Sequence, residues 1–267
     1  MAYVKPEDVV ENMLKAGANK ANLGIKDLLI RGALSGVFLG YATTLAITAI
    51  TQTGLGIVGA IIFPVGFVMI ILLGLELATG NFALLPIAVM DGRTTMSKLA
   101  FNWTWVLIGN LIGSVLYAFL YYIVITKMGH IDPTTIAAAK KIIAVAEHKT
   151  LAYGALGFNG TISAFTSALL CNWMVTLGAV MALTSTTTIG KIAAMWLPIM
   201  TFFALGYEHA IVNMFVIPAG IMLGANISIG EWWAYNEIPV ILGNIIGGML
   251  FTGMALYITA RKKEAAL

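Results

Sequence analysis

Charged residues are scarce in this chain. Only 10% of its 267 residues are Asp, Glu, Lys or Arg, whereas 60% are hydrophobic and the mean hydropathy is +0.92. Ordinary soluble domains carry about 25% charged residues. A chain this apolar cannot cover itself with polar surface in water, so the composition predicts an integral membrane protein. The net charge is only +3 and the basic residues fall in short loops, which leaves no basic patch for nucleic acid.

Cysteine is nearly absent as well. Cys171 is the single cysteine and lies inside an apolar run. Without a second thiol the chain has neither an internal disulfide framework nor a cysteine-based metal site. It also has no His-Glu-x-x-His motif of a metalloprotease and no Ser–His pair in a Gly-x-Ser-x-Gly-like setting. We therefore expect no metal, no cofactor and no enzymatic activity.

The most prominent feature of the sequence is its long runs of apolar residues. A helix needs about 20 apolar residues to cross a bilayer. Six runs qualify, and we expect an all-α protein with six transmembrane helices in one domain, 1–267. The runs are Gly32–Ile50, a stretch within Gly54–Met90, Leu99–Ile125, Ser163–Leu183, a stretch within Ile192–Leu223, and Pro239–Ala260.

The distribution of basic residues predicts the orientation. Six spans place both termini on one side of the membrane, and the side that carries more Lys and Arg faces the cytoplasm. One side has eleven such residues and the other, within 126–162, has four. Both termini are therefore expected in the cytoplasm. The eleven are Lys5, Lys15, Lys20, Lys26, Arg31, Arg93, Lys98, Lys191, Arg261, Lys262 and Lys263, and the four are Lys127, Lys140, Lys141 and Lys149.

The second and fifth runs are longer than one span needs and contain the same motif. Gly54–Met90 has 37 residues, which would extend about 55 Å as one straight helix. Glu76 begins a Glu-x4-Asn-x4-Pro pattern that contains Asn81, and Glu208 begins a second copy that contains Asn213. Over-long, interrupted runs at matching positions in two halves are typical of broken helices around a midplane site.

A second pair of motifs supports an internal repeat. Gly109-Asn-Leu-Ile-Gly113 in the third span matches Gly243-Asn-Ile-Ile-Gly247 in the sixth. Since each repeat has three spans, the two copies must face opposite ways across the membrane. We divide the chain into a cytoplasmic amphipathic N-terminal helix (1–31), a first repeat (32–125), a periplasmic connection (126–162), a second repeat (163–260) and a cytoplasmic tail (261–267).

Three ionisable residues, Glu76, Glu208 and His209, lie deep in these apolar runs. Such residues are costly in a membrane and are functional candidates. The glutamates match one another in the repeat, so we favour a structural role in which each accepts backbone N–H bonds at its helix break. His209 has the apolar Leu77 as its repeat partner and therefore breaks the symmetry. Imidazole exchanges protons near neutral pH, so it could hold an anion or pass it a proton.

Short polar and aromatic residues surround these positions. Thr79 and Asn172 could hydrogen-bond a small anion opposite His209, although helix–helix contacts are an equal alternative. Rings near the breaks, from Phe63, Phe67 and Phe202, could form apolar constrictions, although core or lipid-facing packing is the usual role of such residues. Glycines at four-residue spacing indicate close helix packing. Lys149, in the external connection, could attract anions to a pore mouth, but a solvated lysine is the default expectation.

These motifs resemble the formate/nitrite transporter family of pentameric channels with an aquaporin-like protomer. The resemblance covers nearly the whole chain and is most specific in Gly206-Tyr-Glu-His-Ala-Ile-Val-Asn-Met-Phe215 and Glu76-Leu-Ala-Thr-Gly-Asn81. It implies a homo-pentamer in a bacterial inner membrane that passes a small anion, with formate favoured over nitrite or hydrosulfide. Ala78 stands where the family's formate channels often have an aromatic residue, so the choice of anion stays open.

The resemblance also implies roles for individual residues. His209 matches the protonatable group in the pore, with Thr79 and Asn172 as its polar neighbours. Lys149 matches a lysine near the pore entrance. The implied constrictions are Phe63 and Phe202 on the periplasmic side, and Phe67, Leu77 and Val175 on the cytoplasmic side.

Transport would follow from the high energy of a bare anion in an apolar constriction. An unpaired buried charge costs many kcal/mol, so an anion that takes up a proton passes more easily as a neutral acid. The main alternative from the residues is a cation symporter driven by Glu76 and Glu208. An aquaporin is excluded because the breaks contain no Asn-Pro-Ala pair, and an ammonium channel would need paired pore histidines.

Overall fold

The computed structural model describes residues 2–261, and its regular elements in this range are helices, apart from one isolated bridge between Tyr3 and Ser185. Four continuous helical segments of 27 to 32 residues are apolar and long enough to cross a membrane. These are α2 (Ile25–Thr53), α6 (Met96–Thr126), α8 (Phe158–Met181) with its extension η2 (Ala182–Thr184), and the run from α11 (Ile229–Glu231) to α13 (Ala255–Ala260). The prediction of an all-helical membrane protein is confirmed. Lys262 and Lys263, which we used in the charge count, lie outside the described residues.

Two further apolar segments are interrupted. The first consists of α3 (Gly56–Ile62), α4 (Pro64–Leu72) and α5 (Ala78–Met90), and the second of α9 (Thr188–Ala204) and α10 (Ala210–Met222). Glycine ends the helix at both breaks: Gly74 has φ of 64° and Gly206 has φ of 71°. These left-handed residues suit glycine because a Cβ is disfavoured there, and they close each helix C-terminus. The prolines of both segments lie within helices or at a helix start, so glycine rather than proline causes the breaks.

The breaks end in the same conformation. Leu77 (φ −120°, ψ 117°) and His209 (φ −115°, ψ 116°) are extended and directly precede α5 and α10. Each residue therefore occupies the N-cap of a helix that starts inside the apolar part of the molecule. This backbone match supports the equivalence of the two motifs in the sequence.

Several boundaries differ from our expectation. The first span begins at Ile25 rather than Gly32, so the segment 1–31 includes the start of α2, and α8 begins at Phe158 rather than Ser163. The last span begins at Ile229 rather than Pro239, because a capping box between Ser228 and Glu231 starts the helix early. The helix then continues through two π-helical stretches, η3 (Trp232–Glu237) and η4 (Gly247–Met254), which flank α12 (Ile238–Ile246). The connection 126–162 is also mostly helical, with η1 (Pro133–Thr135) and α7 (Ala137–Ala155).

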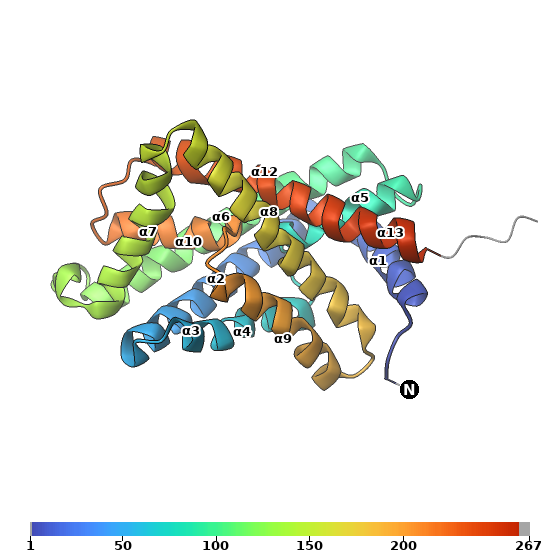
Figure 1. Cartoon of the computed structure of the whole chain (residues 1–267), viewed down its shortest axis with the longest axis horizontal. Coiled ribbons are helices and arrows are strands. Elements are labelled where there is room, and N and C mark those ends of the chain that lie inside the picture. Colours follow the sequence, from blue (N-terminus) through green and yellow to red (C-terminus); the bar gives the residue numbers. More distant parts are fainter. Residues whose placement is uncertain (1, 262–267) are drawn as a thin grey trace, which may run out of the picture.

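The N-terminal helix α1 (Pro6–Ala21) lies against the protein. It buries Val9, Val10, Met13 and Leu14 in a cluster with Leu84 and Ile87 of α5. The helix α7 packs in the same way on α10, where Ala146 lies close to Gly220. Figure 1 shows α1 near the end of α13 at one end of the molecule and α7 at the opposite end. Each interrupted segment is thus covered by one additional helix.

Glycines allow the long helices to approach closely. A Cβ added to Gly36 would overlap the backbone of Asn110, and one added to Gly113 would overlap that of Ala33. Gly243 and Gly247 meet the backbone of α8 in the same way. The expected close packing of small residues is confirmed at these positions.

Candidate functional site

His209 and Thr79 meet at the centre of the molecule. The Thr79 Oγ1 lies 3.1 Å from His209 Nε2, and both residues are buried, with 0% and 2% exposure. The backbone N–H of Val212 donates to His209 Nδ1 at 3.2 Å, which makes the imidazole the side-chain cap of α10. Since Nδ1 accepts this bond, a neutral ring carries its proton on Nε2 and donates it to Thr79. The Thr79 hydroxyl keeps its own proton to donate elsewhere.

Asn172 lies next to this pair. Its Nδ2 donates to the backbone oxygens of Thr79 (3.1 Å) and Asn244 (2.6 Å). Its Oδ1 is buried without a hydrogen-bond partner among the described residues. The structure thus brings Thr79, Asn172 and His209 together. The Nδ2 bonds of Asn172 are the helix–helix contacts that the sequence left as its alternative role, and its Oδ1 is a free acceptor among the described residues.

Aromatic rings stack outward from the histidine. The Phe202 ring lies 5.6 Å from the imidazole, and Phe63 meets Phe202 edge to face at 5.7 Å. Phe203, which our sequence analysis did not single out, stacks on Phe63 at 4.0 Å. Phe63 lies between α3 and α4, eleven residues before Gly74, so tertiary packing rather than proximity in sequence brings it to the histidine.

The remaining predicted constriction residues are also buried. Phe67, Leu77 and Val175 are at most 3% exposed. Leu77 precedes α5 at the position that His209 occupies before α10, and Phe67 lies close to α8 at Gly178. These three residues form part of the same hydrophobic core cluster as Phe63 and Phe202.

Asparagines complete the hydrogen bonds of the broken helices. The Asn110 Oδ1 accepts from the backbone N–H of Ala78 at 3.0 Å, and its Nδ2 donates to the backbone carbonyl oxygen of Glu76 at 2.9 Å. Asn244 makes the same bonds to Ala210 and Glu208, both at 3.0 Å. We expected the glutamate side chains to bind these N–H groups, and that expectation is wrong. The amide side chain suits the position because it donates and accepts at once.

The two glutamates instead bind lysine and asparagine side chains. Glu208 accepts from Lys149 Nζ and Asn213 Nδ2, both at 2.8 Å. Glu76 accepts from Lys20 Nζ at 2.6 Å and from Asn81 Nδ2 at 2.8 Å. Each carboxylate is 2% exposed, so the ion pairs replace hydration that burial removes.

We expected Lys149 to be solvated, and that expectation is wrong. Its side chain is only 14% exposed and forms the ion pair with Glu208. The sequence analysis also missed Lys20 as its counterpart. The signal was the order along the chain: in each half, a lysine precedes the Glu-x4-Asn motif by nearly the same number of residues.

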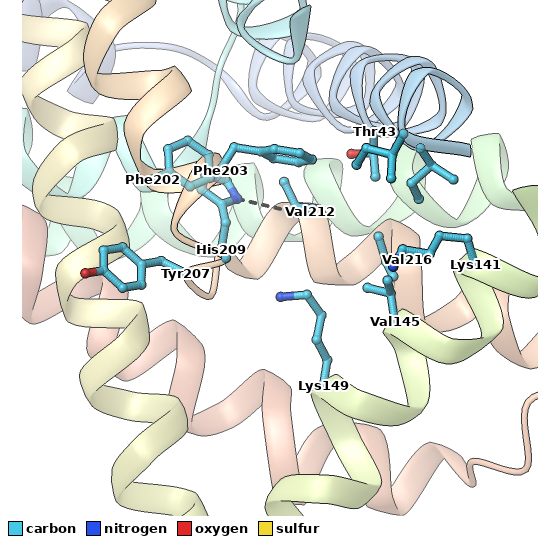
Figure 2. Close-up of a pocket in the computed structure, with 13 residues that line it drawn as sticks. Thr43, Lys141, Val145, Lys149, Phe202, Phe203, Tyr207, His209, Val212 and Val216 are labelled. Atoms are coloured by element: carbon cyan, nitrogen blue, oxygen red, sulfur yellow. Dashed lines mark hydrogen bonds between the residues drawn. The ribbon is translucent and has the colours of Figure 1, made fainter. Parts of the chain in front are cut away.

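A cavity of about 180 Å³ reaches the histidine from the side of α7. Its wall combines His209, Phe202 and Phe203 with two lysines of α7, and Figure 2 shows Lys149 extending toward His209 while Lys141 lies further along the same helix near Val216. The mouth therefore carries positive charge, whereas most of the remaining lining is apolar. Such a cavity suits a small anion that loses its water on the way in.

The sequence analysis did not identify a third deeply buried carboxylate. Glu237 is fully buried in η3; its Oε2 accepts from the Trp232 indole at 2.9 Å, and its Oε1 has no partner among the described residues. We placed this residue in a polar stretch before the last span. The capping box at Ser228 was the signal that the helix starts earlier.

Within residues 2–261, no group of three His, Cys, Asp or Glu side chains could hold a metal ion.

Paired helix breaks, a buried histidine between them and a cavity with a cationic mouth are typical of membrane channels and transporters. The fold and the site therefore place the protein in this class. A family model described as "Formate/nitrite transporter" matches residues 7–258. The chain belongs to the formate/nitrite transporter family, whose members are anion channels and transporters rather than enzymes.

Three similar proteins illustrate the relationship. The chain is 35% identical to "Uncharacterized transporter YrhG" of Bacillus subtilis (99% of this chain, 96% of the relative). It is 31% identical to "Formate channel BtFdhC" of Bacillus thuringiensis (99% of both chains). A solved structure described as "Pentameric formate channel with formate bound" matches with a TM-score of 0.69 and 26% identity, over 88% of this chain and 96% of that one.

Proposed function

We propose that this protein conducts formate across a bacterial inner membrane and that passage is linked to a proton through His209. The observation that carries the proposal is the buried Thr79–His209 pair at the end of an apolar cavity with a cationic mouth. Nitrite and hydrosulfide are the alternative anions. The relatives named as formate channels support formate among the three.

The hydrogen bonds of His209 support a relay rather than a fixed imidazolium. Its Nδ1 accepts from Val212 at the N-terminus of α10, a position where a positive charge is unfavourable. A weak-acid anion that leaves water at Phe202 becomes more basic, because desolvation disfavours its charge. It then takes up a proton that enters from the outer solution along the water of the cavity, so that no hydroxide is left behind, and the Nε2–H and the Thr79 hydroxyl orient that exchange. The neutral acid crosses the apolar region at lower cost than the anion.

The protein is proposed to cross the membrane six times, as two inverted repeats with an aquaporin-like arrangement. The four long helices supply four crossings and the two interrupted segments supply the other two. The matched bonds of Asn110 and Asn244 support the repeat. Both termini are proposed to be cytoplasmic, with α7 on the periplasmic side, from the lysine and arginine distribution.

A homo-pentamer is proposed from the similar solved structure that is described as pentameric. Large apolar side chains are exposed along α2 and α6, which provides surface for lipid and for neighbouring protomers. Examples are Leu34, Tyr41, Leu45, Ile112, Leu116 and Leu120.

The test is anion flux into liposomes between pH 5 and pH 8. The wild type and His209→Asn are compared for formate, nitrite and hydrosulfide at equal protein density, and folding is checked by size-exclusion chromatography. Saturable formate flux that rises as external pH falls, and loses this dependence in His209→Asn, supports the proposal. Faster nitrite or hydrosulfide flux changes the substrate but keeps the mechanism. Folded wild-type protein that passes none of the three anions refutes it.

A further inference from the structure

The cavity that reaches His209 from the side of α7 is called the outer cavity below. The charged residues around it do not contribute equally to its electrostatic potential. Among the described residues, the cavity wall contains two lysines, Lys141 and Lys149, together with His209. Lys149 is paired with Glu208 at 2.8 Å, so this pair carries no net charge. The neutral His209 ring, bonded through both nitrogens, adds none either.

Lys141 differs from Lys149 in having no ion-pair or hydrogen-bond partner within residues 2–261, and its side chain is exposed at the cavity. It lies eight residues before Lys149, which is about two helical turns and places both on the same face of α7. A neighbouring cavity of about 440 Å³ is also lined by Lys141, Lys149 and Glu208. The uncompensated positive charge of the mouth is therefore that of Lys141.

The helix α1 of the other half has no lysine at the corresponding position. The residue eight positions before Lys20, the counterpart of Lys149, is Asn12, and it lines a cavity of about 480 Å³ beside α1. Lys15 of that cavity is paired with Glu11 at 3.4 Å. A lysine without an ion-pair partner at this position of the covering helix is thus a feature of the second half, whereas the cavity beside α1 is lined by Lys191 of α9.

We propose that Lys141 is the anion-capture residue of this channel, which binds a small monovalent oxyanion at the outer mouth before it reaches His209. The inference rests on the proposed function, since it names the residue that admits the same anion. Its effect is electrostatic: at about 7 Å in water, two unit charges interact by a fraction of a kcal/mol, which corresponds to about a threefold change in capture. The effect must weaken as salt shortens the screening length from about 30 Å at 0.01 M to about 3 Å at 1 M.

The chain offers a precise test, because its only cysteine, Cys171, is fully buried. Lys141→Cys introduces one accessible thiol, and the adjacent Lys140→Cys is the matched control, since Lys140 is exposed on α7 but lines neither outer cavity. Each variant is modified in detergent with aminoethyl or sulfonatoethyl methanethiosulfonate, which add side chains of similar size and opposite charge. Formate uptake below half-saturation is then measured in liposomes at pH 7.5, in 10 mM and 500 mM of a salt with an impermeant anion such as gluconate.

The proposal expects the two adducts at position 141 to differ by about tenfold at low salt, because the charge changes by two units. The difference should nearly vanish at high salt, and the adducts at position 140 should differ clearly less than those at 141, because that side chain lies outside both cavities. The uptake rate at saturating formate should change little at either position. Equal uptake by the two adducts at 141, or an equal effect at 140, overturns the inference while the channel function stands. A wild type that passes no anion overturns both.

Discussion

Lys20 and Lys149 hold equivalent positions in the two halves of this protein. Lys20 Nζ lies 2.6 Å from Glu76 Oε1, and Lys149 Nζ lies 2.8 Å from Glu208 Oε2. The neighbouring asparagines extend the match: Asn102 donates to the backbone oxygen of Lys20, and Asn236 donates to that of Lys149. The helices α1 and α7 therefore make matching contacts with the two interrupted segments.

Replacing Thr79 by Val should lower formate flux by about tenfold. The variant keeps the shape of the side chain but leaves the buried Nε2–H of His209 unpaired, which costs about 1 to 3 kcal/mol. Thr79→Ser retains the hydroxyl and should conduct within about twofold of the wild type. Both are measured by the same liposome assay at pH 6. A Val variant that conducts normally would show that the hydroxyl takes no part in passage.

Breaking the buried ion pair of α7 should destabilise the protein strongly. Lys149→Met leaves the Glu208 carboxylate without its cation, and such changes cost about 3 to 5 kcal/mol. The double variant Lys149→Met/Glu208→Met should recover part of this loss, because neither charge remains buried alone. The free energy of unfolding is measured by denaturant titration in mixed micelles. Lys140→Met is the control and should change it by less than about 0.5 kcal/mol. Additive losses in the double variant would contradict the pairing.

The close approach of α2 and α6 predicts a cost for one added methyl group. In Gly113→Ala the new Cβ would overlap the Ala33 backbone, which cannot rotate away, so we expect a loss of about 1 to 3 kcal/mol in unfolding free energy. Gly56→Ala is the matched control, since nothing lies within 4 Å of its added Cβ. The control should be neutral, or more stable by up to about 1 kcal/mol. Equal stability of the two variants would argue against this helix contact.

The contact between α1 and the loop after α5 predicts an acid-dependent contribution to stability. Two hydrogen bonds from Arg93 to Glu11, at 2.9 and 2.7 Å, are the main cause that lowers the pKa of this carboxyl from 4.5 to about 2. Since the pKa is lower in the folded state, the contribution is full above about pH 4.5 and is lost as the pH falls toward 2. Both side chains are partly exposed, so we expect at most about 1 kcal/mol.

The measurement compares thermal unfolding of the wild type and Glu11→Gln in detergent between pH 3 and pH 7. The wild type should be the more stable protein at pH 6, and the difference between the two curves should shrink as the pH falls from about 4.5 to 3. A constant difference across this range would mean that Glu11 stabilises the protein by packing alone.

The sequence by itself determined the class of protein and the positions of its paired helix breaks. A composition with 10% charged residues left a membrane as the only suitable environment. The Glu-x4-Asn-x4-Pro motif, present at Glu76 and Glu208, identified the paired breaks because a repeat is visible without knowledge of contacts. His209 was found for the same reason, since it is the polar exception to its apolar repeat partner Leu77.

Only the tertiary structure decided the partners of these residues. Lys20 and Lys149 lie more than fifty residues from the glutamates that they neutralise, and no local periodicity encodes a contact at that separation. The bond from Val212 to Nδ1, which assigns the imidazole proton to Nε2, depends on where α10 starts. Lys141 and Lys149 have the same charge in the sequence, but among the described residues only Lys149 has a carboxylate partner. Packing therefore decides which of the two charges is neutralised.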